Sequence, residues 1–118
     1  MNPILKEAFD REMSLAKQLY AAADYAGAMR RLERAHVLGQ RNAWPHTINH
    51  WWMLKVGLRR RDRREILGQI PRLLGGGLVS LLGRAPIGNT GGANVGIMKV
   101  MPIEPELAEI FRRAGFGR

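Results

Sequence analysis

The chain has three histidines, and all of them fall within fifteen residues, with a glutamate three residues before the first. Glu33 and His36 form the pattern E-x-x-H, and His46 and His50 form H-x-x-x-H. Side chains three or four residues apart share one face of a helix, so each pair can point at one place. Imidazole and carboxylate groups bind divalent transition metals such as zinc, iron, copper or nickel. The spacing therefore predicts a metal site made by Glu33, His36, His46 and His50.

These residues also have a purely structural interpretation. His36 extends the apolar stripe of a predicted helix, as a histidine packed in a core does. Glu33 lies near Arg30 and Arg34 and could form surface ion pairs, which contribute little to stability. A single carboxylate argues against a ferritin-like di-iron centre, which uses several glutamates. Both interpretations stay open, and the sequence names no catalytic residue.

Helix-capping residues indicate the elements that must position these side chains. Asn2, followed by a proline, opens a first predicted helix, and Asp24 caps a second. Gly39 is placed to end the second helix as a left-handed cap. Pro45 opens a third helix that runs to about Arg60. Because the link between the second and third helices is short, we expect them to be antiparallel neighbours, with the histidines at the closed end.

A fourth helix is predicted after the arginine-rich stretch. Asp62 and Glu65 form a capping box at its start. Pro71 should kink or restart the helix, because proline removes one backbone hydrogen bond and clashes with the preceding turn. The three glycines 75–77 should end or loosen it, followed by a short apolar turn over 78–82.

The remaining chain changes in composition. Residues 84–104 are rich in Gly and Asn and are predicted to form an extended segment that wraps across the helices, and residues 105–114 a short final helix. We expect one domain over 1–118, with its helical core at about 3–83. The fold class is all-α: a bundle of about four helices, in which the second predicted helix belongs to a tetratricopeptide-like hairpin.

The Gly/Asn-rich segment offers a second candidate site. Asn89, Thr90 and Asn94 lie among four glycines and could form a ligand loop whose backbone N–H groups bind a phosphate. The segment matches neither the dinucleotide-binding nor the P-loop motif. The alternative is a loop whose glycines adopt positive φ.

Composition restricts the classes of function. The chain has 118 residues, 46% of them hydrophobic, which argues against disorder, and no cysteine, which excludes disulfides, thiolate metal sites and a thiol nucleophile. The net charge is +9, and five of the basic residues form one run: Arg59, Arg60, Arg61, Arg63 and Arg64. Such a run attracts an acidic protein partner, nucleic acid or anionic head groups. It is equally typical of a solvated helix junction.

The sequence also bears on location and assembly. The charged N-terminal residues do not resemble a signal peptide, and the most apolar stretch, 73–83, is too short to span a bilayer. We therefore expect a cytoplasmic protein without a membrane span. A small bundle with three tryptophans is compatible with a homodimer.

Three strings in the chain resemble a known family: LERAHVLGQ at 32–40, HTINHWWMLKVGLRRRDRREILGQ at 46–69 and RAPIGNTGGANVGIMKVMPIEPEL at 84–107. They are similar to the uncharacterised bacterial domain-of-unknown-function family 3703. The resemblance implies a short, all-helical bacterial protein, often encoded beside heavy-metal resistance or mobile-element genes. It favours a metal role and supplies no catalytic residue.

The leading hypothesis is therefore a transition-metal-binding protein that handles or senses metal or performs a metal-dependent reaction. The alternative is a non-enzymatic interaction module with an arginine-rich docking face, and nucleic-acid binding is third. Whether the protein is an enzyme stays open.

Overall fold

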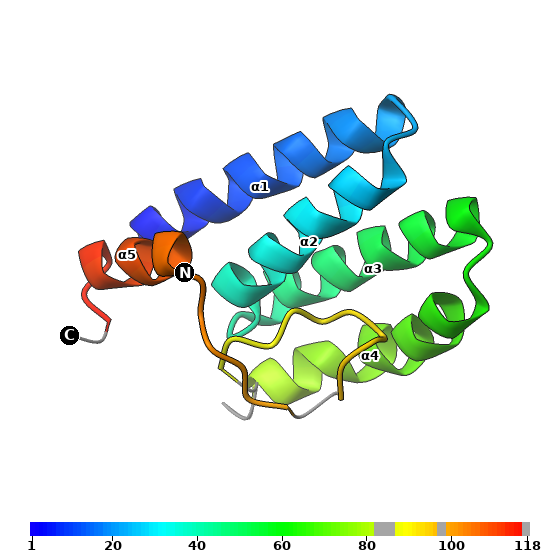
Figure 1. Cartoon of the computed structure of the whole chain (residues 1–118). Coiled ribbons are helices and arrows are strands. Elements are labelled where there is room, and N and C mark those ends of the chain that lie inside the picture. The colour runs from blue at the N-terminus through cyan, green and yellow to red at the C-terminus, as the bar shows by residue number, and fades with distance from the viewer. Residues whose placement is uncertain (82–86, 97–98, 117–118) are drawn as a thin grey trace.

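The computed structural model describes residues 1–81, 87–96 and 99–116, without the side chains of 76–81. It contains five helices in the described part: α1 (Pro3–Ala21), α2 (Tyr25–Gly39), α3 (Ala43–Arg60), α4 (Arg63–Leu81) and α5 (Pro105–Arg113). No strand occurs in these residues. Figure 1 shows successive antiparallel helices α1 to α4, with the short α5 beside the start of α1. The all-α prediction, with four main helices and a short C-terminal helix, is confirmed.

The predicted helix caps are present. The Asn2 side-chain oxygen accepts hydrogen bonds from the backbone N–H groups of Ile4 and Leu5. Asp24 accepts from the N–H of Gly27 at 2.9 Å, and Asp62 accepts from the N–H of Glu65 at 3.1 Å. Each cap satisfies a donor that the first turn of a helix leaves without an intrahelical partner.

The prediction that Gly39 ends α2 as a left-handed cap is wrong. Gly39 is the last residue of α2, and the cap after it, Gln40, has the right-handed φ of −64°. A Cβ on Gly39 would lie 2.8 Å from ring carbons of Phe9. Glycine therefore serves here to let α1 pack closely on α2.

The predictions that the fourth helix restarts at Pro71 or ends at the glycines are wrong, whereas a kink at Pro71 or a loosening at the glycines stays a prediction. The helix continues through Pro71 and through glycines 75–77 as far as Leu81. Glycine and proline lower helix stability without forbidding it, and tertiary contacts can outweigh that cost. The side chain of Arg72 bonds to the backbone oxygen of Val95 at 2.8 Å, which ties the helix to the Gly/Asn-rich segment beside the proline. Of the predicted turn over 78–82, residues 78–81 are helical and 82 lies outside the described residues.

A cluster of ion pairs around the buried Arg34 holds α5 and the chain before it against the first two helices. Arg34, on α2, has a side chain that is only 7% exposed. It donates to Glu12 of α1 at 2.9 Å, to Glu104 at 2.8 Å and to Glu106 of α5. Apolar side chains such as Leu107 pack into the core beside this cluster. Three segments distant in the chain thus meet at one guanidinium.

The Gly/Asn-rich segment lies across the helices, as predicted. In Figure 1 its described part, drawn in yellow, passes beside α2 and α4, and it bonds to His36 of α2 and to Gln69 of α4. The Asn89 side chain is 2% exposed and holds the segment in a closed loop. Its amide nitrogen donates to the carbonyls of Gly96 and Lys99, and its oxygen accepts from the N–H of Gly91.

None of the described helices combines the length and the apolar character that crossing a membrane requires.

Candidate metal centre

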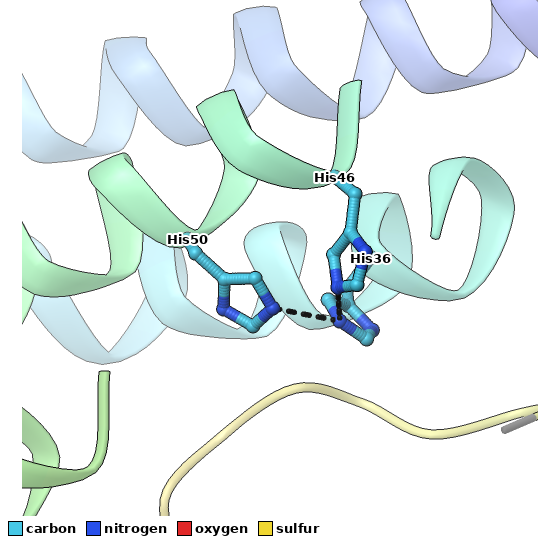
Figure 2. A group of neighbouring side chains, drawn as sticks. All are labelled: His36, His46 and His50. Atoms are coloured by element: carbon cyan, nitrogen blue, oxygen red, sulfur yellow. Dashed lines mark hydrogen bonds between the residues drawn. The ribbon is translucent and has the colours of Figure 1, made fainter. Parts of the chain in front are cut away.

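The three histidines meet inside the bundle. His36 lies near the end of α2, and His46 and His50 lie in the first two turns of α3. The short link between the two helices brings these turns side by side, as the spacing predicted. The Nε2 atom of His36 lies 3.1 Å from the Nε2 atom of His46 and 3.1 Å from that of His50 (Figure 2). Each ring offers a nitrogen within 4.8 Å of those of the other two. Together they form a group that could hold a metal ion.

Hydrogen bonds on the outer side of two rings determine where their protons are. His36 Nδ1 lies 2.6 Å from the carbonyl oxygen of Asn89, which can only accept. His50 Nδ1 lies 2.6 Å from Oε1 of Gln69. The orientation of the Gln69 amide follows from its nitrogen, which donates to Glu65 and to the carbonyl of Gly91. Both Nδ1 atoms therefore carry the proton, and both Nε2 atoms of the neutral rings present a lone pair inward.

Two inward lone pairs at 3.1 Å repel each other unless a cation lies between them. A proton on His46 can be shared with His36, but the neutral His36 and His50 rings have none to place between their Nε2 atoms. Ligand nitrogens about 2.0–2.1 Å from a tetrahedral zinc ion lie about 3.3 Å apart. The two separations from His36 Nε2 are close to that value.

Burial keeps these rings neutral. Desolvation, followed by the charges of the neighbouring histidines, holds the pKa of His36 well below its usual value. The same causes lower the pKa of His50 to about 3, although the bond to Gln69 opposes the shift. Imidazole binds a metal only in its neutral form. At physiological pH His36 and His50 are therefore neutral and can bind a cation without first losing a proton.

The Gly/Asn-rich segment covers the site. Gly91 has φ of +81°, and a Cβ on it would lie 2.5 Å from Cδ2 of His36. The segment is also bonded to α4, because Gln69 donates to the Gly91 carbonyl at 2.8 Å and Glu65 accepts from the N–H of Ala93 at 2.8 Å. Sequence reasoning missed Gln69, the Asn89 carbonyl and Gly91 as parts of the site. The only signal was the high glycine content of this segment.

Glu33 is not in the three-histidine group. It is half-buried and lines a small cavity of about 40 Å³ with Arg30 and Thr90. Burial raises its pKa, Arg30 opposes the rise, and the charges of Glu65 and Glu104 add to it. Its role as a fourth ligand stays a prediction.

The polar side chain of Asn89 in the predicted ligand loop is bonded within the loop itself. Both polar atoms of the Asn89 side chain bond to backbone groups of the segment. Thr90 is half-buried and Asn94 is exposed. Gly88 and Gly91 have positive φ, as the alternative interpretation of this segment expected. Phosphate binding here stays a prediction.

The arginine run lies at the junction of α3 and α4, and all five of its arginines are exposed. Arg61 ends α3 with a left-handed φ of 55°. Arg59 donates to the Tyr20 hydroxyl at 3.0 Å. Partner binding by the arginine run stays a prediction.

A larger cavity lies away from the histidines. Its volume is about 580 Å³, and it opens between the start of α1, the end of α2 and α5. Its walls are mostly apolar side chains, among them Leu5, Val37, Leu38, Ile103 and Phe111. Sequence reasoning gave no indication of it.

Comparisons with known proteins place the chain without assigning it an activity. No curated protein and no solved structure matches it. One family, described as a protein of unknown function (DUF3703), matches residues 4–111. The match covers the helices that carry the three histidines and the segment over them, and the chain belongs to this family.

Proposed function

We propose that this protein binds a divalent transition metal ion through the Nε2 atoms of His36, His46 and His50, and that it acts in metal handling or sensing or in a metal-dependent reaction. The observation that carries the proposal is the convergence of the three rings, two of which direct unprotonated nitrogens at each other across 3.1 Å. The bonds to the Asn89 carbonyl and to Gln69 support it, because metal-bound histidines use their other ring nitrogen in this way.

The donor set favours particular metals. Neutral imidazoles suit zinc, copper, nickel, cobalt and iron, whereas magnesium and calcium prefer oxygen ligands. Three protein ligands leave a further position, which catalytic zinc sites keep for water or substrate. Glu33, which lies one helical turn before His36 on α2, is the residue we propose to supply a carboxylate if that position is filled from the chain. In that case the site would serve storage or sensing rather than a reaction.

The first test is the metal content of tag-free protein purified without chelator, measured by plasma mass spectrometry. We expect about one zinc, copper, nickel, cobalt or iron ion per chain. X-ray absorption at the edge of the bound metal should show nitrogen neighbours at about 2.0–2.1 Å with the outer-shell pattern of imidazole. A bound metal without imidazole neighbours would refute the site, and this measurement needs no variant.

The variant test replaces both His36 and His50 by alanine. The double variant should lose stoichiometric metal while Arg60→Gln, an exposed change on the same α3 helix, retains it. Circular dichroism establishes that each variant is folded. Unchanged metal content in a folded double variant would contradict the proposal.

The exposure of the whole arginine run favours a second candidate, an interaction module for an acidic protein partner. Charge reversal at Arg60 and Arg63 should then abolish capture of a polyglutamate resin and leave metal content unchanged. Nucleic-acid binding is the third candidate. It predicts a gel shift whose affinity falls steeply with salt, because phosphate contacts release counterions.

A further inference from the structure

Two helices carry an apolar face that nothing in the described chain covers. Six large side chains on α3 and α4 are between 44% and 82% exposed: Trp44, Trp51, Leu58, Leu67, Ile70 and Leu74. Single exposed apolar residues are common on protein surfaces, but an organised group of them marks an interaction site. An organised group requires that the six side chains share one face.

Within each helix they do. Trp44, Trp51 and Leu58 are spaced by seven residues, which places them in one line along α3, as the seam positions of a coiled coil are. Leu67, Ile70 and Leu74 follow at spacings of three and four, which is one stripe along α4. Each helix thus presents a continuous row.

The inward contacts of α3 show which way its row points. Asn49 of α3 donates to the Leu32 carbonyl of α2, so that side of α3 faces α2. At about 100° per residue, the row from Trp44 to Leu58 lies roughly 160° around the helix from Asn49. The row therefore points away from α2.

The inward contacts of α4 show that its row points to the same side. Arg72 bonds to Val95, and a Cβ on Gly68 would meet Ala93, so this side of α4 faces the Gly/Asn-rich segment. The row from Leu67 to Leu74 lies roughly 150° away from it by the same geometry. That segment also contacts His36 of α2. Both rows thus lie on the side of the α3–α4 pair opposite α2 and the segment.

The antiparallel pairing of α3 with α4 makes the two rows contiguous. Gly57 lies against Glu65, and Met53 contacts Gln69, so Leu58 is level with the start of α4 and Trp51 with its middle. The positions between the two rows are apolar or neutral: Thr47, Leu54, Ile66 and Leu73. Lys55 flanks the α3 row on its other side, with its ammonium over the Trp52 ring. We call this surface the α3–α4 face.

The six exposed side chains of the α3–α4 face supply most of the area that a standard interface buries on each partner. They offer on the order of 600 Å² per chain, at about 150–200 Å² for each fully exposed one. The half-buried residues between them add to this area. A standard interface buries about 800 Å² per partner, whereas the largest apolar patch of a typical monomer is about 300–600 Å².

We propose that the α3–α4 face is the interface of a homodimer, in which α3 and α4 of two chains pack about a two-fold axis as a four-helix bundle. A second copy is the occupant that the face fits, because a two-fold interface is the same patch on both subunits and needs no charge complementarity. The exposed arginine run lies at one end of the α3–α4 pair. Antiparallel packing of the two pairs places the two runs at opposite ends, which separates the like charges.

This inference is independent of the proposed metal site. The histidines lie between α2 and α3, and Gln69 lies on the inner side of α4, so each subunit holds its own site. A measurement of metal content and a measurement of oligomeric state can therefore refute the two proposals separately.

Sedimentation equilibrium of the full chain over a hundredfold range of concentration tests the dimer. We expect a species of twice the 13.3 kDa chain mass that dissociates on dilution. Tryptophan emission should shift to longer wavelength over the same dilution, because Trp44 and Trp51 lie in the α3–α4 face. A monomer at every concentration would overturn the proposal.

Two substitutions locate the interface. Leu67→Glu and Leu74→Glu change exposed residues and should each give a folded monomer. Val100→Glu replaces an equally exposed apolar residue outside the α3–α4 face, and it should leave the dimer intact. A dimer that survives both leucine substitutions, or one that is lost in the Val100 control, would show that another surface mediates assembly.

Discussion

The substitution Gly91→Ala tests whether the Gly/Asn-rich segment shapes the histidine group. Gly91 has φ of +81°, a left-handed conformation that costs a residue with a Cβ about 1–2 kcal/mol. The added Cβ would also lie 2.5 Å from Cδ2 and 2.8 Å from Nε2 of His36, so the ring or the segment must move. Movement of the segment weakens the 2.6 Å bond between His36 and the Asn89 carbonyl. We expect a total loss of about 2–4 kcal/mol in the free energy of unfolding.

Metal binding should weaken as well. Outer partners of metal-bound histidines contribute about 10–100-fold to metal affinity. Urea unfolding followed by circular dichroism measures the first effect on chelator-treated protein, and competition with a chromophoric chelator measures the second. The matched control is Gly96→Ala in the same segment, where the nearest atom to an added Cβ is 3.8 Å away. Equal stability and equal metal affinity in the two variants would refute the argument.

Three further predictions follow from buried polar groups. Gln69→Leu removes the acceptor of His50 Nδ1, and it should lower metal affinity about 10–100-fold in a competition titration. An unchanged metal affinity would show that the metal does not bind at these rings. In chelator-treated protein, folding lowers the pKa of His50 from about 6.5 to about 3, and it lowers the pKa of His36 as well. Below pH 6.5 the unfolded state therefore binds more protons than the folded state. Stability should thus fall with decreasing pH by about 1.4 kcal/mol per pH unit for each histidine, and a flat urea midpoint between about pH 6.5 and pH 5 would contradict this. Glu12→Ala removes one of the three carboxylates bound to the buried Arg34 and should destabilise the protein by about 1.5–3 kcal/mol in thermal or urea unfolding, whereas Glu7→Ala, at an exposed pair, should cost under about 1 kcal/mol.

The meeting of the three histidines was predictable because it depends on local rules. His46 and His50 share a face through their spacing, and the short link to α2 places His36 against them. The E-x-x-H spacing gave Glu33 the same status. In the structure Glu33 is half-buried and lies outside the three-histidine group, and its role as a fourth ligand stays a prediction. Periodicity alone does not distinguish these two environments.

The partners of the histidines could not be predicted, for a different reason. Gln69 lies nineteen residues beyond His50, and Asn89 lies fifty-three beyond His36, and no local pattern states which distant segments meet. Glycine is ambiguous in the same way. A glycine at a helix end indicates a left-handed cap, yet Gly39 is there because the Phe9 ring leaves no room for a Cβ.

The order in which the chain is synthesised gives the location of the three histidines a further consequence. All three lie between residues 36 and 50 on adjoining helices, so the proposed ligand set is complete when less than half of the 118 residues have left the ribosome. The covering segment and α5 are made later and close over the rings through contacts far apart in the chain. Local contacts form faster than distant ones. We therefore expect the hairpin of α2 and α3 to be open to a metal ion during synthesis, and the finished protein to exchange it slowly, at the rate at which the segment detaches.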